Sequence, residues 1–181
     1  YRLAAPETIP EKSEAFLQRY QNICQIGKDR IRRAGELIKK EMNAKIDDGF
    51  RVFRVDDSNM KEVYYSAEEY AQGMLAMLES NIKEDRNDLD LLFGCLLEWG
   101  LALSLPYCSE EMSGCTVHNY NDGDLIACFD EDVSDDVMES IARRRPARAV
   151  FRDCSFADSP AKINVCEIFK RLAPDTRVRV I

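Results

Sequence analysis

The last third of the chain alternates between short apolar runs and amphipathic segments. Apolar runs lie at 125–129 and 148–152, and a third run at 177–181 alternates, with Val178 and Val180 on one face. Continuous apolar runs are typical of strands covered on both faces, and alternation is typical of an edge strand. Strands and helices that follow each other at this spacing form right-handed crossovers. We therefore predict an α/β fold with a mostly parallel sheet of about four or five strands and flanking helices.

The helices between these runs have recognisable ends. Ser134 can cap a helix that reaches about Arg145 and that Pro146 would stop. Asn164 has Glu167 three residues later, which is the spacing of a capping box and predicts that the second helix begins there. The residues expected to face the core are Val137, Met138 and Ile141 in the first helix, and Val165, Cys166, Phe169 and Leu172 in the second.

A long amphipathic helix is predicted ahead of this fold, from Ser13 to about Ala44. Its apolar stripe steps by three and four residues through Phe16, Tyr20, Ile23, Gly27, Ile31, Ala34 and Ile38. Lys28, Arg32 and Lys39 lie along one flank of the stripe. A solvated helix face is the more common role of such charges. The alternative is contact with a phosphate backbone or an acidic partner, which makes these three residues candidate DNA or partner contacts.

The chain is expected to form two parts. Residues 1–45 are predicted to be a linker and a long helix that leave an upstream domain, and residues 46–181 are predicted to be a C-terminal α/β domain. Between the long helix and the last third, the pattern predicts a strand at 50–55, helices at 67–79 and 87–101, a strand at 116–120 and a turn at 121–123.

Composition and charge narrow the functional classes. The 181 residues carry 25 Lys and Arg against 33 Asp and Glu, so the net charge is −8, which argues against a surface that grips nucleic acid everywhere. No apolar run approaches the length of a membrane span, and seven cysteines without a C-x-x-C pair indicate a cytoplasmic protein. Because the sequence begins at Tyr1 rather than Met, we expect it to be a piece of a longer protein.

Two groups of residues could carry chemistry. Asp130, Arg152 and Asp153 follow neighbouring predicted strands, and open parallel sheets bind ligands outside such strand ends. No Gly-rich phosphate loop follows either strand, so a structural ion pair between the two loops is the favoured interpretation. Cys108, Cys115, His118 and Cys128 supply four possible zinc ligands, but their spacing does not fit a zinc knuckle, and unrelated thiols are favoured. No catalytic, cofactor-binding or metal-ligating residue is therefore predicted.

Several segments, taken in order, resemble one protein family. They are Tyr20-x-x-Ile23-x-x-Ile26-Gly27-Lys28-x-Arg30-Ile31-Arg32-Arg33-Ala34, Gly49-Phe50-Arg51-Val52-Phe53 with Asp57-Ser58-Asn59, Asn81-Ile82-Lys83-Glu84-Asp85-Arg86 with Asp90-Leu91-Leu92-Phe93, Trp99-Gly100-x-x-Leu103-Ser104-Leu105-Pro106, Val150-Phe151-Arg152-Asp153-x-x-Phe156, and Lys162-Ile163-Asn164-Val165 before Pro174-Asp175-Thr176. Together they resemble the C-terminal region of the modification subunit of type III restriction–modification systems, bacterial adenine-specific DNA methyltransferases that use S-adenosylmethionine.

The resemblance implies a non-catalytic part of an enzyme. The family's D-P-P-Y-type adenine motif and its F-x-G-x-G-type methyl-donor loop are not in this sequence and lie upstream in the family. The piece is therefore expected to be inactive alone and to bind no S-adenosylmethionine, which would be the cofactor of the parent protein. The implied partners are the upstream methyltransferase domain, a second modification subunit, the restriction (helicase–nuclease) subunit, and DNA through the full complex.

Two other classes of function remain open at this point. One is a stand-alone nucleic-acid-binding module that uses the basic helix, whose affinity for nucleic acid would fall steeply with salt. The other is a small-ligand-binding α/β enzyme at the carboxyl ends of the strands, where Asp130, Arg152 and Asp153 lie. No contact with a membrane is expected in any of the three.

Overall fold

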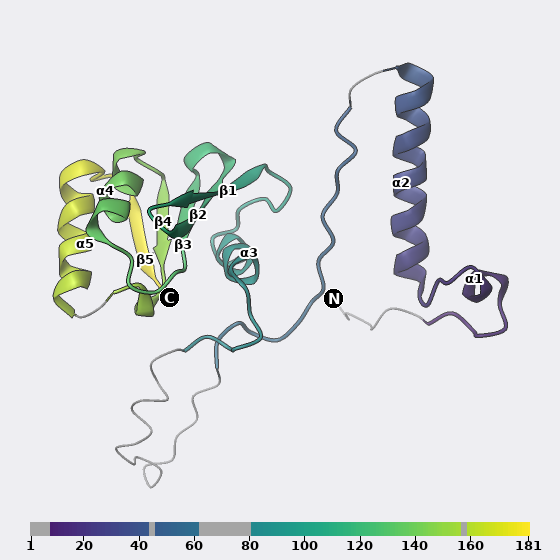
Figure 1. Ribbon diagram of the computed structural model, residues 1–181, viewed down its shortest axis with the longest axis horizontal. Helices are drawn as coiled ribbons and strands as arrows, with labels where there is room; N and C mark the ends of the chain where they lie inside the picture. The colour runs from purple at the N-terminus through teal and green to yellow at the C-terminus, as the bar shows by residue number, and fades with distance from the viewer. Residues whose placement is uncertain (1–7, 44–45, 62–80, 157–158) are drawn as a thin grey trace, which may run out of the picture. The chain divides into compact units, whose positions relative to one another are not determined.

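The computed structural model describes residues 8–43, 46–61, 81–156 and 159–181 (Figure 1). The chain divides into two compact units, Tyr1–Asp56 and Asp57–Ile181. The helix predicted at 67–79 lies outside the described residues. None of the helices in the described ranges has the length and apolar composition needed to cross a membrane.

The second unit is built on a five-stranded sheet whose spatial order is the order along the chain. The strands are β1 Tyr107–Met112, β2 Cys115–Tyr120, β3 Leu125–Cys128, β4 Arg148–Phe151 and β5 Arg177–Val180. β1 and β2 pair antiparallel, as do β2 and β3, whereas β3 with β4 and β4 with β5 are parallel. The predicted α/β class is confirmed, but the prediction of a mostly parallel sheet is wrong, because the sheet is mixed.

Short turns explain the antiparallel half of the sheet. β1 and β2 are separated only by Ser113 and Gly114, whose φ angles are 50° and 84°, as the hairpin turns that match strand twist require. β2 and β3 are joined by the short helix η2, Asn121–Gly123, again with positive φ. Connections this short cannot return a chain parallel to itself, because a parallel crossover needs a dozen or more residues. β1 was not predicted because its sequence, Tyr-Cys-Ser-Glu-Glu-Met, has three consecutive polar residues at its centre and no apolar alternation.

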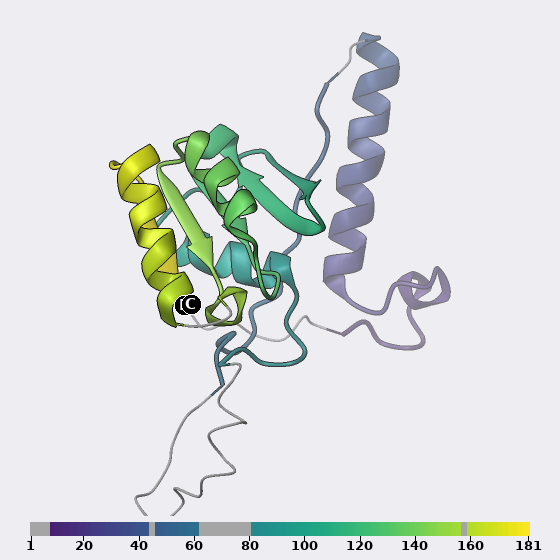
Figure 2. The ribbon, with the colours of Figure 1, turned by 60° about the vertical axis from the view of Figure 1, so that its left-hand side comes forward.

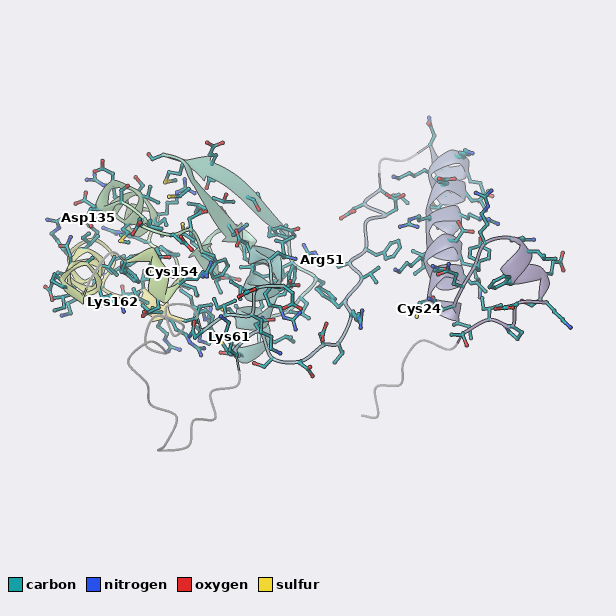
Figure 3. The ribbon with its side chains drawn as sticks, turned by 60° about the horizontal axis from the view of Figure 1, so that its bottom comes forward. Cys24, Arg51, Lys61, Asp135, Cys154 and Lys162 are labelled. Carbon is teal, nitrogen blue, oxygen red and sulfur yellow. The ribbon has the colours of Figure 1, made fainter. Side chains whose placement is uncertain are left out.

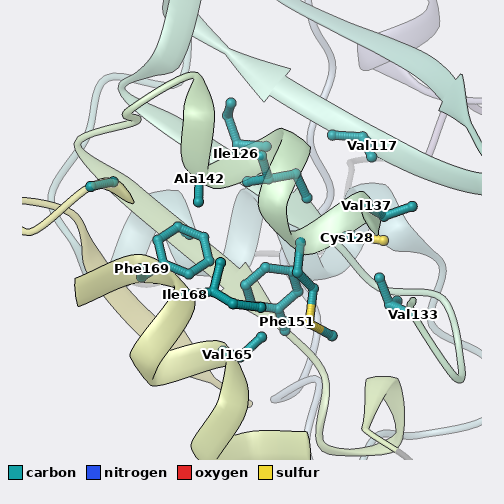
Figure 4. Packing of buried hydrophobic residues seen from close by; sticks show 14 of the residues in the cluster. Val117, Ile126, Cys128, Val133, Val137, Ala142, Phe151, Val165, Ile168 and Phe169 are labelled. Atoms are coloured by element: carbon teal, nitrogen blue, oxygen red, sulfur yellow. The ribbon is translucent and has the colours of Figure 1, made fainter. Parts of the chain in front are cut away.

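Helices cover both faces of the sheet (Figure 2). α4, Asp135–Arg143, and α5, Ser159–Leu172, pack on one face, and α3, Asp88–Glu98, packs on the other. On the first face Phe151 of β4 lies edge-on to Phe169, with ring centroids 6.0 Å apart (Figure 4). It also lies edge-on to Phe156, with ring centroids 5.9 Å apart. Residues next to each other on β3 and β4 thus alternate between two apolar cores, which is why their sequences are continuously apolar.

The predicted helix positions are correct in part. Val137, Met138, Ile141, Val165 and Phe169 are buried as predicted. Cys166 is exposed, which contradicts the prediction. The buried face of α5 is formed by Val165, Ile168 and Phe169, and Cys166 lies outside it. α5 also begins five residues before the predicted Asn164 cap. α3 is capped by Asn87 as predicted, with a capping box to Asp90, and ends where Gly100 takes a φ of 65°.

The first unit contains a short and a long helix. The predicted continuous helix is interrupted: α1, Glu14–Leu17, is capped by Ser13, Arg19 takes a φ of 72°, and α2, Ile23–Met42, starts afresh from an Asn22 cap. The strand predicted at 50–55 is not formed. That segment instead runs back along α2, because Asp48 lies beside Gly35 and Lys39 while Phe50 lies under Arg32.

Candidate functional site

The loops that follow β3 and β4 lie side by side, as predicted for parallel neighbours. The buried Ser155 joins them: its hydroxyl donates to the carbonyl oxygen of Asp130 (2.6 Å) and accepts from the amide of Arg152 (3.2 Å). The amide of Val133 donates to the Ser155 carbonyl oxygen (2.9 Å), and Arg152 Nη1 donates to the carbonyl oxygen of Phe129 (3.3 Å). Many of the hydrogen-bonding groups at these strand ends are therefore used to hold the two loops together.

The two carboxylates predicted at this place turn in different directions. Asp130 Oδ2 accepts from the backbone amide of Thr116 on β2 (2.5 Å). Asp153 Oδ1 pairs with Lys162 Nζ of α5 at 2.6 Å. Figure 3 labels Lys162 near Cys154, the residue that follows Asp153. The residues singled out from the sequence are close in space, but the contacts seen for them are the ones that hold neighbouring elements together.

The predicted set of possible zinc ligands is divided between the faces of the sheet. His118 is only 4% exposed and lies on the α3 side, where its Nδ1 is 2.8 Å from Ser109 Oγ and its Nε2 is 3.4 Å from Asp88 Oδ2. Its ring also lies against that of Phe129, with the ring centroids 6.0 Å apart. The contacts of His118 are those of a core histidine with satisfied ring nitrogens.

A different trio comes together on the α4 side of the sheet. The side-chain ligand atoms of Cys115, Cys128 and Asp130 all lie within 4.8 Å of one another. Burial raises the pKa of Cys128 to about 12, so this thiol is neutral at ordinary pH. Asp130 was a candidate from the sequence because it follows a predicted strand, not as a metal ligand. The trio was not predicted, because the register between β2 and β3 is needed to see that these residues meet. Val117 pairs with Cys128, and continuing that register by two residues puts Cys115 opposite Asp130.

A basic pocket of about 520 Å³ lies at the opposite ends of β4 and β5, where these strands begin. Arg145, Arg148 and Arg177 line it together with Asp175 and Thr176. The Arg148 guanidinium lies over the ring of Trp99 at 5.7 Å, and its buried Nε has no hydrogen-bond partner among the described residues. The Arg148 Nη1 also donates to the carbonyl oxygen of Asp124 (3.4 Å), so Arg145 and Arg177 are the arginines of this lining that are left to meet an anion such as a phosphate.

The basic flank of α2 is largely engaged within its own unit. Lys39 Nζ pairs with Asp48 Oδ1 at 2.5 Å, and this contact lowers the pKa of the Asp48 carboxyl. The Arg32 guanidinium lies over the Phe50 ring at 5.7 Å, and Lys28 is half-buried. Two of the three candidate DNA contacts thus hold the returning segment against the helix.

The apolar face of α2 is largely exposed to solvent. We use this name for its large exposed apolar side chains, Ile23, Ile31, Leu37, Ile38 and Met42. Ile31 is 51% exposed, Ile38 43% and Met42 70%. A helix of 20 residues gains most of its stability from packing such a face, and in the described residues this face is largely open to solvent.

The sequence was compared with protein-family models and with curated proteins. No family model matches the chain, and no curated protein matches it.

Proposed function

We propose that the chain is the non-catalytic C-terminal region of a type III modification subunit, and that it contributes to subunit assembly through the apolar face of α2. The observation that supports this most directly is the exposure of that face along a helix of five turns. The proposed parent protein, a cytoplasmic adenine-specific DNA methyltransferase, rests on the ordered segments that resemble the family. S-adenosylmethionine would be bound by the domain upstream of Tyr1.

The partner that best fits the apolar face is the same helix of a second modification subunit. Small residues lie within the face: an added Cβ at Gly27 would meet nothing within 4 Å, and Ala34 is exposed. Small residues on a helix surface let a second backbone approach closely. The face itself is largely uncharged, whereas the charges of the helix lie on its flanks, so an uncharged partner surface suits it. The restriction subunit would then bind elsewhere on the assembled dimer.

Sedimentation velocity of the chain over a range of concentrations tests the assembly role. We expect a concentration-dependent dimer, and we expect Ile38→Glu to shift it to monomer because a carboxylate would be buried without a partner at the centre of the contact. Lys40→Glu is the matched control, since it introduces the same carboxylate on an exposed position away from the apolar face. A wild-type chain that stays monomeric at all concentrations, or equal behaviour of the two variants, would refute this role.

The same chain is expected to have no methyltransferase activity alone. Isothermal titration with S-adenosylmethionine should show no heat of binding, and incubation with unmethylated duplex DNA and the cofactor should transfer no methyl group. Micromolar binding of the cofactor would contradict the assignment of this region as non-catalytic.

A second function, positioning of DNA, is favoured by the basic pocket rather than by α2. Arg145 and Arg177 are exposed at its opening, whereas Arg32 and Lys39 are engaged by the returning segment. Fluorescence anisotropy with a labelled duplex at several salt concentrations tests this function. Arg177→Ala should weaken binding and lower the salt slope by about one, as loss of a phosphate contact does. Arg143→Ala is the control, because Arg143 pairs with Glu139 on α4.

A small-ligand enzyme at the carboxyl ends of the strands has the least support. The Ser155 hydrogen bonds, the Thr116–Asp130 contact and the Asp153–Lys162 pair all use polar groups that such an enzyme would direct at its substrate. We therefore place the functions of this chain on its outer surfaces.

A further inference from the structure

Two thiols and a carboxylate meet at the edge of the α4-side core. Cys115 begins β2, Cys128 ends β3, and Asp130 follows two residues later. Cys115 and Val117 are two residues apart on β2, and Val117 pairs with Cys128, so the antiparallel register puts the two cysteines on one face. Asp130 lies two residues beyond the end of β3, and the hydrogen bond from the Thr116 amide to its Oδ2 brings its carboxylate to the same place.

The spacing of these three groups suits one metal ion. The Cys128 sulfur lies 3.8 Å from Asp130 Oδ2, and all three ligand atoms lie within 4.8 Å of one another. In a tetrahedral zinc site with Zn–S of about 2.3 Å and Zn–O of about 2.1 Å, ligand atoms are roughly 3.6 to 3.8 Å apart. One pair already has this separation, and the third ligand needs to move by no more than about 1 Å.

The carboxylate is oriented before any ion arrives. The backbone amide of Thr116 donates to Asp130 Oδ2 at 2.5 Å, and the neighbouring carbonyl of Asp130 is held by Ser155. Groups that orient a ligand in this way are typical of metal sites, and their loss commonly lowers metal affinity. Cys115 and Asp130 are partly exposed while Cys128 is buried, so an ion can approach from the solvent side.

We propose that Cys115, Cys128 and Asp130 form a binding site for a single thiophilic divalent cation, of which zinc is the most suitable. Two thiolates select zinc or a similar soft cation over magnesium and calcium, which prefer oxygen ligands. The three protein ligands leave the fourth tetrahedral position to a water molecule. On binding, each thiol loses its proton to solvent and forms a sulfur–metal bond, and the carboxylate adds an oxygen–metal bond, so no oxidant or reductant is needed.

The competing interpretation is purely structural. In that interpretation the Cys128 thiol donates a weak hydrogen bond to Asp130, and the two cysteines are small core residues. The two interpretations differ in what happens when a metal is supplied. A hydrogen-bonded thiol pair predicts no stoichiometric uptake that depends on all three residues.

Cobalt(II) is the probe for the experiment, because thiolate ligation gives a sulfur-to-cobalt charge-transfer band and tetrahedral geometry gives intense visible bands. The fully reduced, metal-free chain would be titrated with Co²⁺ and then with Zn²⁺. We expect saturation at one cobalt per chain, displacement of the cobalt by one equivalent of zinc, and one zinc retained after gel filtration when measured by elemental analysis.

Substitutions then identify the ligands. Asp130→Asn keeps the size of the side chain and both thiols, and should weaken cobalt binding by at least about tenfold; Cys115→Ser should reduce the charge-transfer band by about half. Cys108→Ser and Cys166→Ser are the controls, because both thiols are exposed and lie outside the trio. Circular dichroism of each variant shows whether its fold is kept, and Asp130→Asn keeps the test decisive if a cysteine variant unfolds.

Two results would overturn the proposal. One is the absence of a charge-transfer band in the folded, reduced chain. The other is cobalt binding that Asp130→Asn and Cys115→Ser leave unchanged or that the control variants reduce equally. The outcome is independent of subunit assembly, since a chain that fails to dimerise can still bind one metal ion and the reverse also holds.

Discussion

The hydroxyl of Ser155 donates a hydrogen bond to the carbonyl oxygen of Asp130, 2.6 Å away and 25 residues earlier in the chain. The same hydroxyl accepts from the amide of Arg152, and the side chain is fully buried. A single oxygen atom therefore ties the loop after β3 to the loop after β4. This contact has a measurable consequence for stability.

Ser155→Ala should destabilise the second unit by about 1–3 kcal/mol, because the partly buried Asp130 carbonyl and Arg152 amide each lose a partner. Urea unfolding followed by circular dichroism measures the change. Ser140→Ala is the matched control: Ser140 also donates to a backbone carbonyl, that of Asp136 at 2.8 Å, but at an exposed position on α4. Equal effects of the two substitutions would show that burial of the Ser155 bridge has no importance.

Two glycines of α2 should respond in different ways to alanine. Gly27 has open space around an added Cβ within its own chain, so at concentrations where the chain is monomeric Gly27→Ala should stabilise the first unit by up to about 1 kcal/mol through helix propensity. At Gly35 the new Cβ would lie 3.0 Å from the Cβ of Asp48, so Gly35→Ala should gain less or lose stability. Thermal unfolding of both variants decides this, and a larger gain for Gly35→Ala would contradict the placement of the returning segment.

The caps of two helices should differ although both were predicted from sequence. The Asn87 side chain accepts from the amides of Leu89 and Asp90, so Asn87→Ala should cost about 1 kcal/mol. Ser134 occupies the cap position of α4 without a side-chain cap hydrogen bond, so Ser134→Ala should cost clearly less. Chemical denaturation of the two variants measures the difference, and the opposite order would contradict the geometry of both caps.

The buried thiol of Cys95 should make stability depend on alkaline pH. Burial raises the pKa of Cys95 from 9.0 to about 11 in the folded chain. Between these values the unfolded chain has lost the proton and the folded chain keeps it, so the free energy of unfolding falls as pH rises from 9 towards 11. Cys95→Ala should remove this part of the pH dependence when unfolding curves at pH 8 and pH 11 are compared. An unchanged difference between the two pH values would refute it.

Residues whose environment is set locally were predicted well from sequence. The apolar runs of β3 and β4, the Asn87 cap and the buried Val137, Met138 and Ile141 follow from periodicity and capping alone. β1 was missed because an edge strand with polar residues on both faces has no apolar period. The predicted parallel order failed for the same reason, since the tight turn at Ser113 and Gly114 joins a strand that periodicity does not reveal.

The candidate sites depended on contacts that periodicity does not contain. Lys39 and Arg32 were candidate DNA or partner contacts beside the more common solvated role, and the segment that engages them was predicted to be a strand. The pairing of Cys115 with Asp130 requires the register between β2 and β3, and the basic pocket requires β4 and β5 to start at the same level. Each of these contacts joins residues that are distant in the sequence. Periodicity and capping involve only residues that are close in the sequence, so they could not predict these contacts.

The order of the strands has a consequence for how the protein is made. Each strand of the sheet pairs with the one that precedes it in the chain, so a strand that leaves the ribosome finds its neighbour already synthesised. No strand must be inserted later between two that have already paired. The sheet can therefore grow from one edge during translation, with the β1–β2 hairpin as its first and most local step.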